Sequence, residues 1–137
     1  MNQDIMNNND DDAVDKYDFK MVITYLARGI QRRLNSARGK VITFNPNRIL
    51  KEEGMPNTAP AHRGLAIYIL RILVKHGWAT EKGRVGHEYK YIIYPDSPLW
   101  EFKGVNDNGE KLARWLTDIV NADENDSTHA NTRAETH

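Results

Sequence analysis

Residues 59–76 constrain the fold more than any other part of the chain, because they predict a helix that is apolar around more than half of its circumference. At 100° per residue, the apolar side chains cover an arc of about 220°. These side chains are Leu65, Ala66, Ile67, Ile69, Leu70, Ile72, Leu73 and Val74. A helix that packs on one neighbour needs an apolar stripe of only about 100°. We therefore expect this helix to be covered on two sides, by the preceding helices and by a hairpin, the last helix or a second subunit.

Two helices and a short strand are predicted before this segment. Residues 16–37 repeat apolar side chains at the i, i+3, i+4 and i+7 spacing of one buried helical stripe. Residues 40–44, Lys-Val-Ile-Thr-Phe, are rich in β-branched side chains and predict a strand. Asn45 and Pro46 then favour a helix over residues 46–53, since asparagine is a preferred N-cap and proline suits the first helical position.

A β-hairpin and a last helix are predicted after the wide apolar helix. Residues 78–82 and 88–94 are strand-like, and the run Gly-Arg-Val-Gly-His between them carries two glycines for the turn. Residues 109–122 place leucine, tryptophan, isoleucine and valine on one helical face, with Asn108 as the expected N-cap. Thr58 is the expected N-cap of the wide apolar helix.

The charge of the chain is divided between its middle and its ends, although the formal net charge is zero. Residues 16–103 hold sixteen bases and seven acids, whereas residues 1–15 hold five acids and no base. Residues 104–137 hold seven acids and three bases. Because the segments 1–15 and 122–137 also lack hydrophobic periodicity, we predict disordered acidic arms around one folded domain over residues 16–121.

The predicted order is helix, strand, helix, helix, strand, strand, helix, with a glycine-tipped hairpin after two helices joined by a turn. With this order, residues 16–94 resemble the winged-helix superfamily. The spacing of Leu70, Leu73 and Gly77, followed by Trp78 and a basic hairpin, is similar to that of small MarR- and PadR-type regulators. The resemblance implies an α+β winged helix-turn-helix that binds DNA, with the wide apolar helix as its recognition helix.

On this interpretation, the polar stripe of the recognition helix enters the major groove. The hairpin, residues 82–90, is the wing and lies on the flanking backbone or in the minor groove. Arginine and lysine bind phosphates, and arginine also reads a guanine edge. The predicted DNA-binding residues of the helix and of the turn before it are Thr58, Ala61, His62, Arg63, Gly64, Tyr68, Arg71 and Lys75. Those of the wing are Lys82, Arg84, His87 and Lys90.

The predicted function is double-stranded DNA binding, as a small transcriptional regulator or a nucleoid-architectural protein. No catalytic residue, metal, cofactor, small-molecule ligand or membrane contact is predicted. The absence of cysteine and the polar, acidic N-terminus favour the cytoplasm. We expect a homodimer through the first and last helices. We also expect the acidic arms to compete with DNA for the basic surface, which would sharpen specificity.

Other patterns give weaker indications. Pro-Asp at 95–96 and Glu-Phe-Lys at 101–103 spell a metal-dependent nuclease motif, but the four residues between them leave no room for a turn between two strands. The histidines form no pair with acids at helical spacing, which argues against zinc. Tyr89 and Tyr91 could stack on single-stranded bases, yet strand aromatics more often pack across strands. The rival interpretation is a winged-helix protein–protein interaction or scaffold module without DNA binding, which would not need a basic wing.

Overall fold

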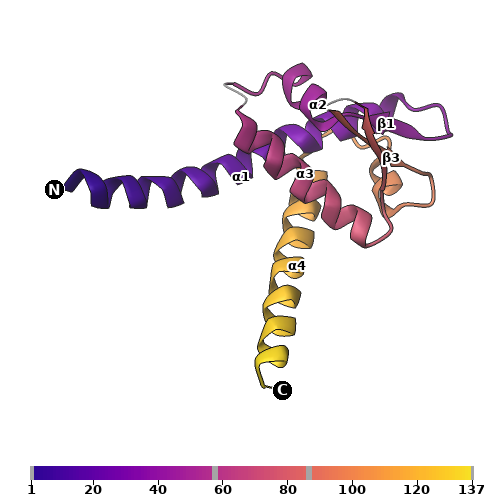
Figure 1. Ribbon diagram of the computed structural model, residues 1–137. Helices are drawn as coiled ribbons and strands as arrows, with labels where there is room; N and C mark the ends of the chain where they lie inside the picture. Colours follow the sequence, from indigo (N-terminus) through magenta and orange to yellow (C-terminus); the bar gives the residue numbers. More distant parts are fainter. Residues whose placement is uncertain (1, 57–58, 86–87, 137) are drawn as a thin grey trace.

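The computed structural model describes residues 2–56, 59–85 and 88–136, and the side chains of residues 18–56, 59–83 and 89–125. This part of the chain is an α+β fold of four α-helices and a three-stranded antiparallel sheet (Figure 1). The predicted order of helices and strands is confirmed, and a 3₁₀ helix that the sequence did not predict, η1 (Pro98–Phe102), is added before the last helix. No helix in the described residues is long and apolar enough to cross a membrane.

The first helix, α1 (Asn2–Ser36), supplies one wall of the core. Its predicted stripe is confirmed, since Val22, Leu26, Ile30 and Leu34 are fully buried. At Gly29 the helix touches α2 (Pro46–Glu52) so closely that a Cβ atom would lie 2.2 Å from the Cγ2 atom of an α2 isoleucine. Glycine is therefore the residue that lets α2 lie directly on α1.

Helix α2 begins as the sequence predicts. Asn45 is its N-cap, and the Asn45 Oδ1 atom accepts a hydrogen bond from the backbone N–H of Arg48 at 3.1 Å. Pro46 occupies the first helical turn, where a missing N–H costs no hydrogen bond. The helix ends at Glu52, one residue earlier than predicted.

Helix α3 (Pro60–Lys75) begins differently from the prediction. Its N-cap is Ala59, and the predicted cap, Thr58, lies outside the described residues. The imidazole of His62 closes the first turn, because its Nδ1 atom accepts a hydrogen bond from the backbone N–H of Ala59 at 2.9 Å. A side chain at the third helical position that reaches back to the N-cap satisfies a donor that the helix itself leaves free.

The wide apolar arc of α3 is covered on two sides, as expected. Helices α1 and α2 contact it, and so do α4 and the strand β2 (Thr80–Val85). The buried residues of α3 at these contacts include Ala66, Ile69, Leu70, Ile72 and Leu73. The second cover therefore comes from the same chain, and the arc does not require a second subunit.

The sheet has the strand order β1-β3-β2, with β1 (Ile42–Phe44) and β2 each antiparallel to the central strand β3 (Glu88–Ile93). Strand β1 starts two residues later than predicted, and its ends pair as Ile42 with Ile93 and Phe44 with Tyr91. All four of these side chains are buried against the helices. Strand β2 is irregular between Glu81 and Arg84.

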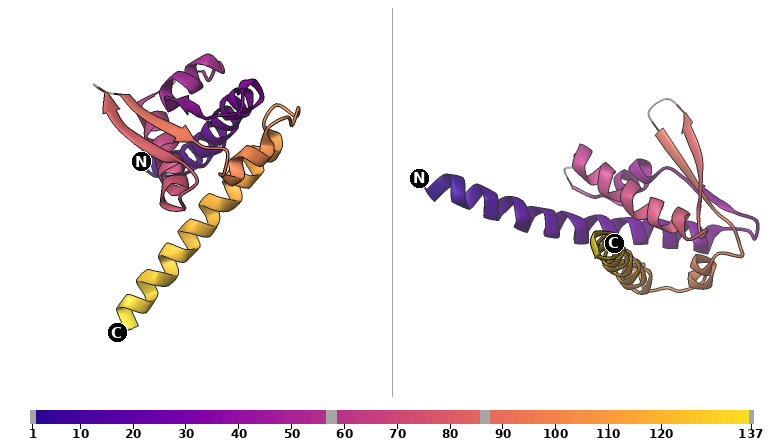
Figure 2. Two further views of the ribbon diagram at one scale, coloured as in Figure 1. Left: turned by 90° about the vertical axis from the view of Figure 1, so that its right-hand side faces the viewer. Right: turned by 60° about the horizontal axis from the view of Figure 1, so that its bottom comes forward.

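The last helix, α4 (Glu110–Thr136), starts at a tight approach to α1. The predicted cap, Asn108, is wrong. Instead, Asp107 accepts hydrogen bonds from the backbone N–H groups of Gly109, at 3.1 Å, and Lys111, at 3.0 Å. Gly109 has a φ of +79°, and a Cβ atom there would lie 2.9 Å from the backbone of Ala27. From this point α4 crosses α1 at a steep angle (Figure 2), with one side buried at Leu112, Leu116 and Val120.

The structure differs from the sequence prediction at both ends of the chain. Helix α1 begins at Asn2 rather than near residue 16, and α4 continues to Thr136 rather than ending near residue 122. Periodicity did not predict these extensions, because segments without an apolar stripe give no pattern to recognise. The end of α1 and the end of α4 point away from the body in different directions (Figure 2).

The end of α1 is held by a residue that follows η1. The Nζ atom of Lys103 donates to the backbone carbonyl of Leu34 at 2.9 Å and also to that of Ala37. The side chain of Gln31 donates to the Phe102 carbonyl at 2.6 Å. A cation at a helix C-terminus offsets the partial negative charge of the last carbonyls. The loop before α4 is thus fixed to the end of α1.

Candidate nucleic-acid interface

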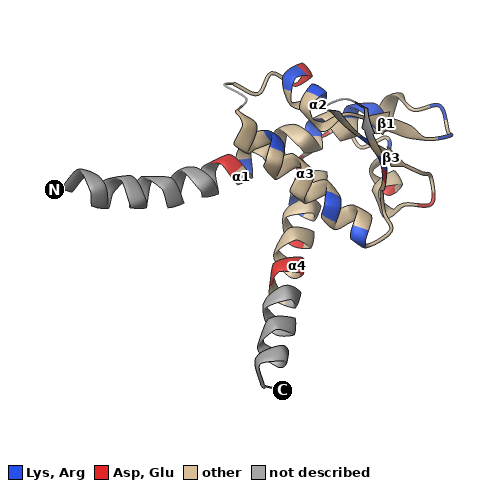
Figure 3. Ribbon diagram, viewed as in Figure 1, with Lys and Arg blue, Asp and Glu red and all other residues tan. Residues whose placement is uncertain are grey.

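The predicted polar stripe of α3 lies at the surface. Ala61, Gly64, Tyr68, Arg71 and Lys75 are all exposed, on the side of α3 opposite its buried face. Nothing lies within 4 Å of the position that a Cβ atom would take at Gly64. The stripe therefore offers close access to the helix backbone near its N-terminus and basic side chains near its C-terminus (Figure 3).

Arg71 is held in one orientation by the β2-β3 hairpin. Its Nε atom lies 3.2 Å from Oε2 of Glu81 on β2. Its guanidinium carbon lies 5.4 Å from the ring centroid of Tyr89 on β3, which is a cation–π distance. The same Glu81 oxygen accepts a hydrogen bond from the Tyr91 hydroxyl at 2.6 Å. Arg71 thus joins α3 to both strands of the hairpin.

The electrostatics of this network keep Glu81 ionised. The pKa of Glu81 is lowered below its ordinary value, mainly by the hydrogen bond from Tyr91. The hydrogen bond and the positive charge of Arg71 lower it further. Burial, together with the neighbouring carboxylate, raises the pKa of Tyr91. Glu81 offsets part of the Arg71 charge, while 55% of the Arg71 side chain stays exposed. Arg71 is therefore a positioned cation rather than a freely moving one.

The C-terminal end of the stripe is covered in part by acidic residues of α4. The Nζ atom of Lys75 lies 2.9 Å from Oδ1 of Asp123, and the Tyr68 hydroxyl lies 3.5 Å from Oε1 of Glu124. Burial, the charge of Glu124 and that of Asp123 raise the pKa of Tyr68. Figure 3 shows these acidic turns of α4 beside the basic end of α3. The sequence predicted that acidic arms compete with DNA for the basic surface, but it did not predict that Asp123 and Glu124 contact Lys75 and Tyr68.

His62 is not a surface residue, which corrects its prediction as a base contact. Only 7% of it is exposed, and its Nε2 atom lies 3.2 Å from Oδ1 of Asp18 on α1. With Nδ1 accepting from Ala59, the imidazole joins the first turn of α3 to α1. Its neighbour Arg63 is half-buried. Of the predicted contacts near the start of α3, Ala61 and Gly64 are the exposed ones.

The described part of the β2-β3 hairpin, the predicted wing, carries two exposed lysines, Lys82 on β2 and Lys90 on β3. Gly83 has a φ of +95°, which glycine adopts readily and which fits the irregularity of the strand at this point. The side chains of two predicted contacts, Arg84 and His87, lie outside the described residues, as does Thr58.

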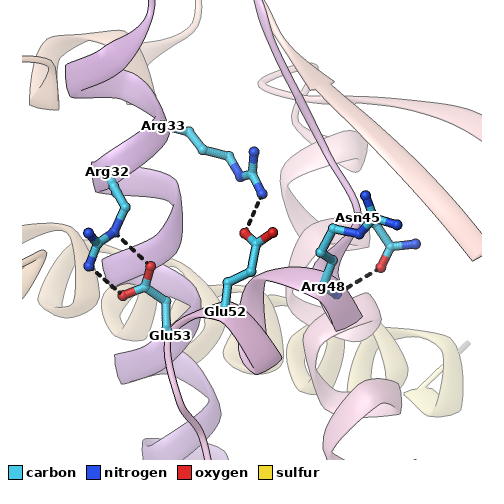
Figure 4. A network of polar contacts seen from close by, with 6 residues as sticks. All are labelled: Arg32, Arg33, Asn45, Arg48, Glu52 and Glu53. Atoms are coloured by element: carbon cyan, nitrogen blue, oxygen red, sulfur yellow. Dashed lines mark hydrogen bonds and ion pairs between the residues drawn. The ribbon is translucent and has the colours of Figure 1, made fainter.

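A second group of cations lies on α1, α2 and β3, and of this group only Lys90 was predicted as a DNA contact. Arg32 and Arg33 pair with Glu53 and Glu52 at 2.9 and 2.8 Å (Figure 4). Arg48 lies beside them, at the start of α2, and Lys90 completes the lining of a polar hollow. The sequence signal that could have identified it is the N-cap Asn45 with an arginine three residues later.

The weaker patterns do not come together as sites in the described residues. Glu101 is exposed on η1, whereas the Lys103 ammonium is bound to the carbonyls at the end of α1. Trp115 packs between Trp78 and Phe102, with ring centroids 5.3 and 5.8 Å apart. Tyr91 is fully buried. Within the described ranges, no group of three or more histidines and acids is arranged to hold a metal ion.

Comparison with known proteins gives no relative from which a function could be inferred, so the proposed function rests on the geometry described above. The chain matches no protein-family model, no curated protein and no solved structure.

Proposed function

We propose that the chain binds double-stranded DNA as a winged helix-turn-helix protein without catalytic activity, in the role of a small transcriptional regulator or a nucleoid-architectural protein. Helix α3 enters the major groove, and the β2-β3 hairpin contacts the flanking backbone or minor groove. The element order and the antiparallel order β1-β3-β2 support this architecture, because both agree with a helix-turn-helix followed by a wing.

The observation that carries the proposal is the exposed stripe of α3 with Arg71 fixed to the hairpin. A helix that reads DNA needs a solvent-facing row of small and basic residues, and α3 has one opposite its buried face. The contacts from Arg71 to Glu81 and Tyr89 join that helix to the hairpin. A preorganised cation loses less conformational entropy when it binds a phosphate or a guanine.

The acids of α4 act in the opposite direction. Asp123 and Glu124 neutralise the C-terminal end of the stripe at Lys75 and Tyr68. A phosphate that binds Lys75 must displace Asp123. The Lys75–Asp123 ion pair therefore lowers the affinity for a DNA backbone of any sequence, while the contacts that the N-terminal part of α3 makes are unchanged. On this proposal, α4 weakens non-specific binding, which depends on phosphate contacts alone.

The proposed assembly is a homodimer through α1 and α4. A groove of about 490 Å³ between these helices is lined by Phe19 and Ile23 together with Arg114, Thr117 and Asp118. An apolar groove edged by polar residues suits a helix from a second copy. Light scattering tests this point, and a monomeric mass at micromolar concentration contradicts it.

The test of DNA binding is a fluorescence-anisotropy titration of a short labelled duplex at two salt concentrations. Arg71→Ala and Lys82→Ala should each weaken binding, and each lost phosphate contact should reduce the salt slope by about 1. Lys111→Ala, which removes an exposed lysine from the first turn of α4, is the matched control and should leave the slope unchanged.

Two results would contradict the proposal. One is a parent protein that does not bind at low salt, which would favour the protein-interaction module instead. The other is an equal loss of affinity in the Lys111→Ala control, which would indicate attraction by overall charge rather than contact by α3 and the wing.

A further inference from the structure

A polar hollow of about 280 Å³ lies where α1, β1, α2 and β3 meet. It is separate from the exposed stripe of α3, which contributes no residue to it. Its polar lining consists of Arg33, Thr43, Asn45, Arg48, Glu52 and Lys90. Since a water molecule occupies about 30 Å³ in the liquid, the hollow has room for a tetrahedral oxyanion and part of its hydration shell.

The lining has an excess of positive charge. Its one acid, Glu52, is already bound by Arg33 at 2.8 Å. Arg48 and Lys90 are both exposed, and neither belongs to an ion pair between described side chains. Among the described side chains, these two cations therefore have no counter-charge at the hollow, and their charge attracts anions.

The amide of Asn45 adds a hydrogen-bond donor that the fold does not use. Asn45 is 7% exposed, and its Oδ1 atom is fixed as the N-cap acceptor for Arg48. The other amide atom, Nδ2, is consequently a donor, and it is buried without a hydrogen-bond acceptor in the described part of the structure. A buried donor without a partner costs free energy, so this position favours a ligand that brings an acceptor.

The Arg48 side chain turns back toward the same amide, as Figure 4 shows. A guanidinium and an amide donor are thus placed together, and both can donate to one oxyanion. Because exposed side chains change rotamer within picoseconds to nanoseconds, Arg48 does not block entry of a ligand.

We propose that this hollow binds a phosphate group, through the Asn45 amide, the Arg48 guanidinium and the Lys90 ammonium. A phosphate offers several acceptor oxygens, which a forked guanidinium and an amide bind together. The phosphate belongs either to the backbone of a nucleic acid or to a free phosphate ester. Binding of the group itself does not depend on the proposed role of α3.

The first experiment titrates inorganic phosphate into the full chain at constant ionic strength, with chloride as the balancing anion, and records ¹H–¹⁵N NMR spectra. The expected result is a saturable shift of the Asn45 side-chain amide and of the backbone amides of Thr43 and Arg48. Asn45→Asp keeps the N-cap acceptor but replaces the donor with a carboxylate oxygen. It should weaken phosphate binding by at least about tenfold, since it removes a hydrogen bond to a charged group.

Arg48→Gln is the second variant, because it removes the charge without altering the cap, and it should weaken binding by a similar factor. Lys51→Gln is the matched control: Lys51 is an exposed cation of α2 that does not line the hollow, so its loss should change binding by less than about twofold. Shifts that are linear in phosphate, or equal in all three variants, would overturn the proposal and leave water as the partner of Asn45.

A second arm separates the two sources of phosphate. If the hollow holds a DNA phosphate, Arg48→Gln should reduce the salt slope of duplex binding by about 1, whereas Lys51→Gln should not. Saturable phosphate binding with an unchanged duplex slope would assign the site to a free phosphate ester. Phosphate binding by a chain that binds no duplex would contradict the proposed function and still support this site.

Discussion

Replacing Gly109 by alanine should destabilise the whole fold, because this glycine satisfies two requirements at once. Its φ of +79° is in the left-handed region, and its Cα hydrogen faces the backbone of α1. A Cβ atom would lie 2.9 Å from the carbonyl carbon and oxygen of Ala27 and from the nitrogen of Arg28. These atoms belong to a helix and cannot move aside as a side chain would.

The cost can be divided into two parts. A left-handed conformation costs a non-glycine residue about 1–2 kcal/mol. Alanine also reduces the conformational entropy of the unfolded chain, which stabilises the folded state by about 0.4–1 kcal/mol. Gly104 has a comparable φ of +89° with nothing within 4 Å of its Cβ position, so Gly104→Ala should show this part alone. At Gly109 the collision adds about 1–3 kcal/mol of overpacking. We therefore expect a total loss of about 1–5 kcal/mol for Gly109→Ala, against about 0–1.6 kcal/mol for Gly104→Ala.

Urea unfolding followed by circular dichroism measures both free energies. Tryptophan fluorescence gives a local readout, since Trp115 on α4 packs against Trp78, with ring centroids 5.3 Å apart. The fluorescence of Gly109→Ala should indicate greater solvent exposure below the unfolding transition, whereas that of Gly104→Ala should not. Equal free energies of unfolding for the two variants would refute the claim that contact with α1, rather than φ, determines the cost.

Three further predictions concern other contacts. The pKa of Glu81 is lowered mainly by the hydrogen bond from Tyr91, so the ionised Glu81 stabilises the fold fully above its ordinary pKa of 4.5, and this stability is lost as the pH falls through the lower folded pKa. Between neutral pH and about pH 3, the melting temperature should therefore fall more steeply for the parent than for Glu81→Gln. Parallel curves for the two proteins would contradict this prediction. Asp123→Asn removes the ion pair between Asp123 and Lys75. If α3 binds DNA, this change should raise duplex affinity in anisotropy titrations by up to about fivefold, whereas unchanged or weaker binding would argue against competition by α4. Gly29→Ala brings a Cβ atom to 2.2 Å from an isoleucine methyl of α2 and should cost about 1–3 kcal/mol, a loss that an unaltered urea midpoint would disprove.

The parts of the fold that the sequence predicted well are those decided by local spacing. The arc of α3 required two covers, and both are present. Asn45 and Pro46 lie at the start of α2 as expected, because an N-cap interacts only with residues three or four positions away. The exposed positions of α3 follow from the same helical period that places its core residues.

His62 shows where this reasoning should have gone further. It lies four, seven and eleven residues before Ala66, Ile69 and Leu73, which places it on the buried face of α3 despite its polarity. Its partner Asp18 is on α1, more than forty residues away in the chain, and no local pattern indicates that contact. A polar residue on an apolar face is better interpreted as a buried hydrogen-bonding group than as a surface contact.

The electrostatics of the candidate site depended on distant residues in the same way. Arg71 and Lys75 were identified as basic positions from their place on α3, but their acidic neighbours come from β2 and α4. Residue pairs that are ten and forty-eight positions apart meet only after the chain has folded. Charge counts along the sequence therefore overestimated the free positive charge of this surface.

The contact between α1 and α4 also determines when the fold can be completed during synthesis. Gln31 and Lys103, which join the end of α1 to the loop before α4, make contacts across about seventy residues. At about 5–20 residues per second, a ribosome needs about 4–15 s to add that length. Throughout this interval the side of α1 that will receive α4 is open to water, chaperones and other nascent chains. Synthesis of α4 thus ends this exposure, and truncation before Gly109 would leave the open state permanent.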